Sequence, residues 1–289
     1  ILSVELLMAQ EGNTCGPLDW VDELRAVEEK VRQVTRTGTR AESSAANALL
    51  YDFNRIPHPF TNMHVTEQGL DQLDEYIGRV RSVIGTKVPL AIDHFGHFPL
   101  PDMIKIARRL EKYHLAWLED MLPWYLTDQY RELKHATTAP IATGEDMYLA
   151  ESFEPLLQAG ALDVVHPDLL TSGGILETKK LGDLAARYGA SMALHMCESP
   201  VSALAGAHMA TASENFFAQE HDAFDSEWWQ DLIIGPVKPI VKDGFTVITD
   251  APGLGIEGLN EDLIREHGPM KGKDVWVSTD EWNQETSLD

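Results

Sequence analysis

Residues 163–195 read DVVHPDLLTSGGILETKKLGDLAARYGASMALH, and they contain one complete strand–helix–strand unit. The first part, 163–168, is a short run built on two valines, and 191–195 is a second short apolar run. Between them, apolar residues recur every three or four positions after the pair Gly173 and Gly174, as in an amphipathic helix. Two strands joined by a helix in this way are typical of a parallel sheet.

The same unit recurs through most of the chain. Strands are predicted at 3–8, 48–53, 88–93, 115–119, 140–145, 163–168, 191–195 and 216–220. Amphipathic helices are predicted between them, for example at 70–84, where Thr66 and Gly85 are residue types that begin and end helices. Eight such units favour an α/β protein with a (β/α)8 TIM-type barrel over a doubly wound sheet, although the count alone leaves the second open.

The strand–helix pattern stops after Glu220. We therefore predict a barrel domain over residues 1–221 and an irregular C-terminal extension over residues 222–289. The chain contains no low-complexity segment.

The composition excludes several classes of partner. Lys and Arg number 23 and Asp and Glu 46, so the net charge of −23 would repel nucleic acids and anionic membranes. Cys15 and Cys197 allow at most one disulfide and no zinc cluster made of thiolates, which is typical of a reducing cytoplasm. No apolar run approaches the ~18 residues of a membrane span. We expect a soluble, cytoplasmic protein that binds neither nucleic acid nor membrane.

A polar, ionisable residue ends each of six predicted strands. These residues are Asp93, Glu119, Glu145, Asp168, His195 and Glu220. A single acidic residue at such a position is usually a helix N-cap or a loop carboxylate. Independent caps have no reason to recur at intervals of one strand–helix unit, however. The phase therefore predicts that all six side chains face the mouth at the carboxyl ends of the strands, where barrel active sites lie.

Three of these residues, Asp93, Glu119 and Glu145, are carboxylates on successive strands. Like charges that close raise one another's pKa unless a cation compensates them. Ligation by oxygen alone favours Mg²⁺, or Mn²⁺, over zinc, which prefers His and Cys. The sequence thus predicts a divalent metal site made by these three residues.

Asp168 and His195, on neighbouring strands, have the composition of a base dyad. A carboxylate fixes the tautomer of the imidazole and stabilises the imidazolium that forms when it takes a proton. His195 alone would more often be a packed or surface histidine, but its place at a strand end beside Asp168 favours a role as general base. Glu220 is predicted to hydrogen-bond charge that develops on a substrate oxygen, provided that it is held protonated.

Several short motifs together resemble the mandelate racemase subgroup of the enolase superfamily, over about residues 3–268. The motifs are LAID at 90–93, AWLED at 116–120, TGE at 143–145, HPD at 166–168 with GGI at 173–175, ALH at 193–195 and PGLG at 252–255. The resemblance implies that Asp93, Glu119 and Glu145 bind Mg²⁺ and that His195 and Asp168 form the base. It also implies that Glu220 faces the developing enolate.

The resemblance further implies the substrate class, an acid sugar, which is a small-molecule carboxylate. We expect an acid-sugar dehydratase, a hydro-lyase that removes the proton α to the carboxylate and then eliminates water. Two alternatives stay open: an epimerase, racemase or cycloisomerase on the same scaffold, and a non-catalytic barrel that keeps the metal. Members of this family are often symmetric oligomers, so a homo-oligomer is also expected.

The sequence departs from the family pattern in two places. Leu50 stands where the second barrel strand commonly carries a catalytic Lys, which favours a one-sided elimination over a two-base racemisation. The cap of roughly a hundred residues that precedes the first barrel strand in this family is not found before residue 3, and we expect that it is missing from the chain as given. His94 and His97 are candidate acids or loop residues, and His166 is assigned a structural role.

Overall fold

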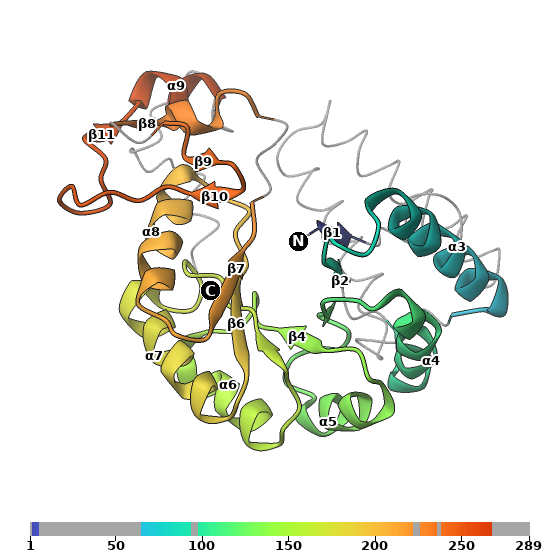
Figure 1. The fold of residues 1–289 in the computed structure, drawn as a ribbon. Helices are drawn as coiled ribbons and strands as arrows, with labels where there is room; N and C mark the ends of the chain where they lie inside the picture. Colours follow the sequence, from blue (N-terminus) through green and yellow to red (C-terminus); the bar gives the residue numbers. More distant parts are fainter. Residues whose placement is uncertain (1, 6–64, 94–97, 222–225, 236–237, 268–289) are drawn as a thin grey trace, which may run out of the picture.

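The computed structural model describes residues 2–5, 65–93, 98–221, 226–235 and 238–267. Its centre is a parallel sheet whose strands follow one another in chain order. The strands are β1 (Leu2–Glu5), β2 (Leu90–Asp93), β3 (Leu118–Glu119), β4 (Ile141–Thr143), β5 (Val164–Val165), β6 (Ser191–Leu194) and β7 (Phe216–Gln219). Within the described residues β1 and β7 are the two edges, and the sheet curls between them (Figure 1). The predicted α/β class and parallel barrel-type sheet are confirmed.

Helices cover the outer side of the curled sheet (Figure 1). They are α3 (Glu67–Ile84), α4 (Leu100–Leu110), α5 (Thr127–Ala136), α6 (Leu149–Gln158), α7 (Gly174–Arg187) and α8 (Pro200–Thr211), with a short 3₁₀ turn, η1 (Glu111–Tyr113), after α4. Among the described residues, none of the helices has the length and apolar content needed to cross a bilayer. Each helix returns the chain to the start of the next parallel strand, as the sequence periodicity predicted.

The strand predicted at 48–53 stays a prediction. The segment 48–53, with Leu50, lies outside the described residues. In the structure β1 pairs directly with β2, with Leu2 opposite Leu90 and Glu5 opposite Asp93.

Helix α3 begins and ends where its sequence predicts. The Thr66 side chain accepts a hydrogen bond from the Gly69 amide at 3.0 Å, which satisfies one amide of the first turn. Gly85 ends the helix with a φ of 68°, a left-handed conformation that glycine adopts without strain. Between these ends Leu70, Leu73 and Ile77 are buried, so the predicted apolar stripe is the face that packs on the sheet.

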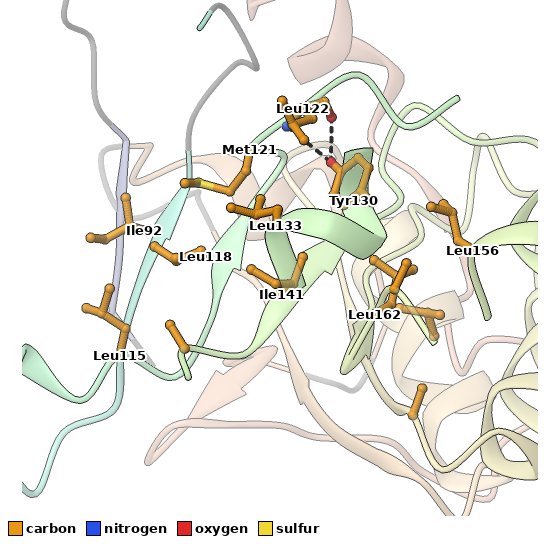
Figure 2. Packing of buried hydrophobic residues seen from close by; sticks show 14 of the residues in the cluster. Ile92, Leu115, Leu118, Met121, Leu122, Tyr130, Leu133, Ile141, Leu156 and Leu162 are labelled. Carbon is orange, nitrogen blue, oxygen red and sulfur yellow. Dashed lines mark hydrogen bonds between the residues drawn. The ribbon is translucent and has the colours of Figure 1, made fainter. Parts of the chain in front are cut away.

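The two faces of the strands build two different packed layers. Outward side chains such as Leu118 and Ile141 pack with the helices in the main core, which Figure 2 shows around Tyr130 and Leu133 of α5. Inward side chains form a smaller buried cluster of Ala91, Trp117, Ala142, Val164 and Ala193. Four of these five are alanine or valine, so the single large Trp117 ring fills much of the space enclosed by the curled sheet.

The residues after β7 form small, short elements. These are η2 (Trp229–Leu232), β8 (Ile233–Ile234), β9 (Val241–Lys242), β10 (Phe245–Thr246), β11 (Gly258–Leu259) and α9 (Glu261–His267). A separate apolar cluster joins them to the barrel, because Trp229 and Ile233 pack with Met196 and Leu204. The boundary predicted between residues 221 and 222 stays a prediction, since 222–225 lie outside the described residues.

Replacing Tyr130 with Phe should destabilise the barrel. The Tyr130 hydroxyl donates a hydrogen bond to the buried Leu122 carbonyl at 2.5 Å (Figure 2), and phenylalanine would leave this acceptor without a donor. We expect the free energy of unfolding to fall by about 2 kcal/mol, measured by urea denaturation. Tyr76→Phe, at an exposed tyrosine of α3, is the matched control, and an equal loss in both variants would contradict the assignment.

Asp74, at the contact between α3 and η1, should make the free energy of unfolding depend on pH in the acid range. Burial opposes its charge, but hydrogen bonds from Lys112, at 2.6 Å, and from Tyr113 lower the pKa of Asp74 below its ordinary value of 3.8. A lowered folded pKa stabilises the protein fully above the ordinary pKa, and this contribution is lost as the pH falls through the folded value.

We therefore expect Asp74→Asn to lower the free energy of unfolding by about 1 kcal/mol at pH 7, and to flatten its decrease below about pH 4. Urea denaturation at a series of pH values measures both effects. Asp128→Asn, at an exposed residue of α5, is the control. If the free energy of unfolding of the wild type and of Asp74→Asn decreased in parallel at low pH, the Asp74 carboxylate would not be the cause of the pH dependence.

Candidate functional site

The alternation of side chains along each strand brings three of the predicted residues to one mouth. In β2, Leu90 and Ile92 belong to the outer core and Ala91 to the inner cluster, so Asp93 at the strand end falls on the inner side. The same alternation puts Glu119, after Leu118, on the inner side of β3, and His195, after Leu194, on the inner side of β6. The sheet therefore collects these side chains at the carboxyl ends of its strands.

A compact acidic group lies at the ends of β2 and β3. It consists of Asp93, Glu119 and Asp120, each of which offers an oxygen within 4.8 Å of the others. Asp120 accepts a hydrogen bond from the Thr143 hydroxyl at 2.5 Å. Burial and the nearby charges of Glu119, Glu145 and Asp93 raise the pKa of Asp120 well above its ordinary value. The group is thus crowded with negative charge that only partly cancels within the protein.

Glu119 is a buried carboxylate of this group with two hydrogen-bond partners. It is 1% exposed, accepts a hydrogen bond from the Trp117 indole at 2.6 Å, and is bonded through its other oxygen to Nδ1 of His166. Burial alone would lower the pKa of His166, but the Glu119 charge and hydrogen bond raise it to about 10. His166 is therefore a buried cation that balances Glu119. Its Nε2 makes no hydrogen bond within the described residues and lies 3.9 Å from Glu220.

Asp168 and His195 form the predicted dyad. Their backbones are bridged in parallel register just beyond β5 and β6, and Asp168 Oδ2 lies 2.7 Å from His195 Nδ1. Burial opposes the charge of Asp168, yet hydrogen bonds from His195, Glu198 and the Leu170 amide lower its pKa to about 2. Burial likewise opposes the charge of His195, but Asp168 and the charges of Glu145 and Glu220 raise its pKa to about 9.

Glu145 and Glu220 lie on either side of these histidines. Glu145 Oε2 is 3.2 Å from Nε2 of His195, and burial is the main cause that raises the pKa of Glu145. Burial also raises the pKa of Glu220, against the opposing charge of His166. The raised pKa of Glu220 is the condition that its predicted role as a hydrogen-bond donor requires.

The donor set of the acidic group fits a hard divalent cation. Its donors are carboxylate oxygens, which are the ligands of such cations, and no thiolate or imidazole is needed. A cation would also remove the repulsion among Asp93, Glu119 and Asp120. The structure differs from the prediction in one respect, because the three-residue group contains Asp120, whereas Glu145 is turned to His195. After burial, the negative charge of Glu119 is a further cause that raises the pKa of Glu145, so the two carboxylates lie close enough to repel each other.

Three residues for which no site role was predicted lie in contact with the site. Asp120 directly follows Glu119, Trp117 directly underlies Glu119, and His166, assigned a structural role, is bonded to it. The signal for His166 and Trp117 is alternation, since each lies two residues before a predicted site residue and shares its face. His94 and His97 lie outside the described residues.

Comparison with known proteins gives one family for most of the chain. The family described as enolase C-terminal domain-like matches residues 56–263. The D-xylonate dehydratase of Haloferax volcanii is 32% identical over 206 residues, which are 71% of this chain and 49% of that protein. The D-gluconate dehydratase of Thermoproteus tenax is 26% identical over 226 residues, which are 75% of this chain and 45% of that protein.

A solved structure gives the same result at the level of the fold. The crystal structure of a mandelate racemase/muconate lactonizing enzyme-like protein from Rubrobacter xylanophilus is 33% identical and superposes with a TM-score of 0.68. The match covers 70% of this chain and 51% of that one. The chain thus spans about half the length of the curated relatives it matches.

Neutralising Asp120 should stabilise the protein in the absence of divalent ions. Asn keeps an oxygen that accepts the Thr143 hydrogen bond, but it removes the carboxyl group whose ionisation is opposed by burial and by the neighbouring charges. At pH 8, with EDTA, we expect the Tm of Asp120→Asn to exceed that of the wild type by about 2–4 °C, or about 1 kcal/mol for a domain of this size. Added Mg²⁺ should then raise the Tm of the variant less than that of the wild type.

Thermal unfolding with EDTA and with Mg²⁺ measures both effects. Asp128→Asn in α5 serves again as the exposed control. A lower Tm of Asp120→Asn in EDTA would mean that the charge of Asp120 is compensated by His166 and His195, and it would contradict the repulsion described above.

Proposed function

Because the chain belongs to the enolase C-terminal domain-like family, we propose that the protein is a Mg²⁺-dependent hydro-lyase that dehydrates an acid sugar. One observation carries the proposal: the dyad of His195 and Asp168 opens onto the same mouth as the carboxylates at the ends of β2 and β3. The names of two relatives, D-xylonate and D-gluconate dehydratase, supply the substrate class.

His195 is the proposed general base. Asp168 accepts the hydrogen bond of Nδ1–H, which leaves the lone pair of the neutral imidazole on Nε2, the nitrogen that faces Glu145 and the mouth. This nitrogen takes the proton α to the substrate carboxylate. The surrounding carboxylates raise the pKa of His195 to about 9, so without a divalent ion the imidazole is neutral only at alkaline pH. Positive charge bound at these carboxylates would lower this pKa and favour the neutral base. Such a positioned base contributes roughly 10² to 10⁴-fold to the rate.

Asp93, Glu119 and Glu145 are the proposed ligands of Mg²⁺, with Asp120 beside them. Bound there, Mg²⁺ would supply positive charge against the negative charge that develops on the substrate carboxylate, an effect worth several kcal/mol. The Trp117 indole and His166 each occupy one lone pair of Glu119 and fix the orientation of its carboxylate.

The remaining groups account for the proton and the leaving water. Glu220, with its raised pKa, holds a proton and donates a hydrogen bond to the substrate oxygen on which charge develops. The electron pair of the broken C2–H bond forms a C2–C3 double bond as the C3–OH bond breaks. The departing hydroxyl group takes a proton from the imidazolium of His195, or from His94 or His97, and leaves as water. The enol product then tautomerises to a 2-keto-3-deoxy acid.

Replacing His195 with Asn should abolish this reaction. The test uses the full-length protein with Mg²⁺ and separate incubations of D-xylonate and D-gluconate in D₂O. We expect the wild type to form the 2-keto acid from at least one of them. In His195→Asn both 2-keto acid formation and exchange of the α-hydrogen should fall by at least about 100-fold, while Mg²⁺ binding persists. Proton NMR measures both reactions, and titration calorimetry measures Mg²⁺ binding.

His135→Asn, an exposed histidine of α5, is the matched control and should behave like the wild type. Exchange that persists undiminished in His195→Asn would remove this residue from the role of base. Isomerisation of an acid sugar without loss of water would favour an epimerase or cycloisomerase on this scaffold. A wild type that is silent toward a library of acid sugars would instead favour a non-catalytic metal-binding barrel.

A further inference from the structure

Behind the dyad, a second carboxyl group is bonded to Asp168. Burial and a hydrogen-bonding interaction with Asp168 raise the pKa of Glu198, and the same interaction helps to lower the pKa of Asp168 against the effect of burial. Glu198 also offers an oxygen within 4.8 Å of a ring nitrogen of His195, so it lies at the dyad itself. Asp168 is 2% exposed and therefore meets these partners with little competition from water. The dyad is thus part of a longer row: His195, Asp168, Glu198.

The structure holds Glu198 in place from two further directions. Its Oε2 accepts a hydrogen bond from the Ser202 hydroxyl at 2.9 Å, in the first turn of α8. Its backbone carbonyl accepts the indole N–H of Trp229 at 2.7 Å, and Trp229 is a buried residue of the apolar cluster that joins the C-terminal elements to the barrel. Both the side chain and the backbone of Glu198 are therefore fixed by neighbouring elements.

We propose that Glu198 is a positioning residue for the reaction proposed above: it carries a proton that it donates to Asp168, and so fixes the carboxylate that orients His195. This inference rests on the proposed role of His195 as the base. Glu198 acts through Asp168 and does not touch the substrate.

Of the two carboxyl groups, Glu198 and Asp168, we place the shared proton on Glu198 because of their different hydrogen-bond partners. Two hydrogen-bonded carboxyl groups share one proton, because two adjacent negative charges repel each other. Asp168 accepts hydrogen bonds from the Leu170 amide, at 2.7 Å, and from Nδ1 of His195, at 2.7 Å, which stabilise its ionised form. Glu198 accepts only the Ser202 hydroxyl among the side-chain contacts described for it. Asp168 is accordingly the carboxylate and Glu198 the acid.

A donated hydrogen bond from Glu198 has two consequences for the dyad. It fills a lone pair of Asp168, so that the carboxylate cannot rotate away from His195 without losing a buried partner. It also makes Asp168 a weaker acceptor, which limits how strongly the carboxylate holds the Nδ1 proton. Through the Trp229 contact, the C-terminal elements fix the segment that carries this acid.

The test compares two substitutions that differ only in whether a donor remains. Glu198→Ala removes the hydrogen bond to Asp168, whereas Glu198→Gln keeps an N–H donor without a titratable proton. With D-xylonate and Mg²⁺, we expect kcat of Glu198→Ala to fall by about 10-fold with little change in KM, and Glu198→Gln to recover most of the wild-type kcat. D-gluconate replaces D-xylonate if only that substrate is turned over.

A second readout does not depend on turnover. The Nδ1 proton of His195, identified in the proton NMR spectrum by its loss in His195→Asn, should shift in Glu198→Ala and stay close to its wild-type position in Glu198→Gln. Glu214→Ala, at an exposed glutamate, is the matched control and should leave both readouts unchanged. If Glu198→Ala does not fold, Ser202→Ala, which removes the hydroxyl bonded to Glu198, should give a smaller shift in the same direction.

The outcomes separate this inference from the proposed function. A wild type without dehydratase activity would overturn the proposed function, and the NMR readout would still decide whether Glu198 donates to Asp168. An active wild type in which Glu198→Ala leaves kcat and the Nδ1 proton unchanged would overturn the inference. Equal losses in Glu198→Gln and Glu198→Ala would also overturn it, because they would show that the donated hydrogen bond is not what matters.

Discussion

The collection of carboxyl groups at one end of a small curled sheet is the constraint on which the site depends. Asp93, Glu119 and Asp120 bring their oxygens within 4.8 Å of one another, although like charges at this distance repel. Two imidazoles partly compensate this negative charge. The buried His166 is hydrogen-bonded to Glu119, and the partly buried His195 lies against Glu145. Contacts between carboxylates and histidines therefore stabilise the carboxyl ends of the strands. They leave part of the negative charge uncompensated, and this acidic group suits a cation.

The inner layer of the barrel makes this arrangement possible. Short side chains at Ala91, Ala142 and Ala193 leave room for Trp117, whose indole N–H supports Glu119 from below. A buried carboxylate without such donors would be neutralised by protonation. Trp117 therefore has two roles: its ring fills the inner core, and its N–H stabilises the ionised form of Glu119. In this sheet the same side chain serves packing and the chemistry of the site.

The dyad shows how a functional group depends on elements distant in the sequence. Asp168 and His195 come from neighbouring strands, and their register is fixed by a backbone bridge. Glu198, which lies just before α8, interacts with Asp168, and the indole of Trp229 from the C-terminal elements donates a hydrogen bond to its backbone carbonyl. In the proposed mechanism the base therefore depends on the barrel for its orientation and on the extension for its support.

The sequence by itself determined the class of fold and the ends of helix α3, and its resemblance to the enolase superfamily is confirmed by the family match. These features follow from local signals: side-chain periodicity, capping residues and the phase of polar residues along parallel strands. Only the tertiary structure decided which side chains meet. It paired His166 with Glu119, grouped Asp120 rather than Glu145 with Asp93, and brought Glu198 to Asp168. Such pairings depend on strand register and side-chain rotamers, which are settled by packing between segments far apart in the chain.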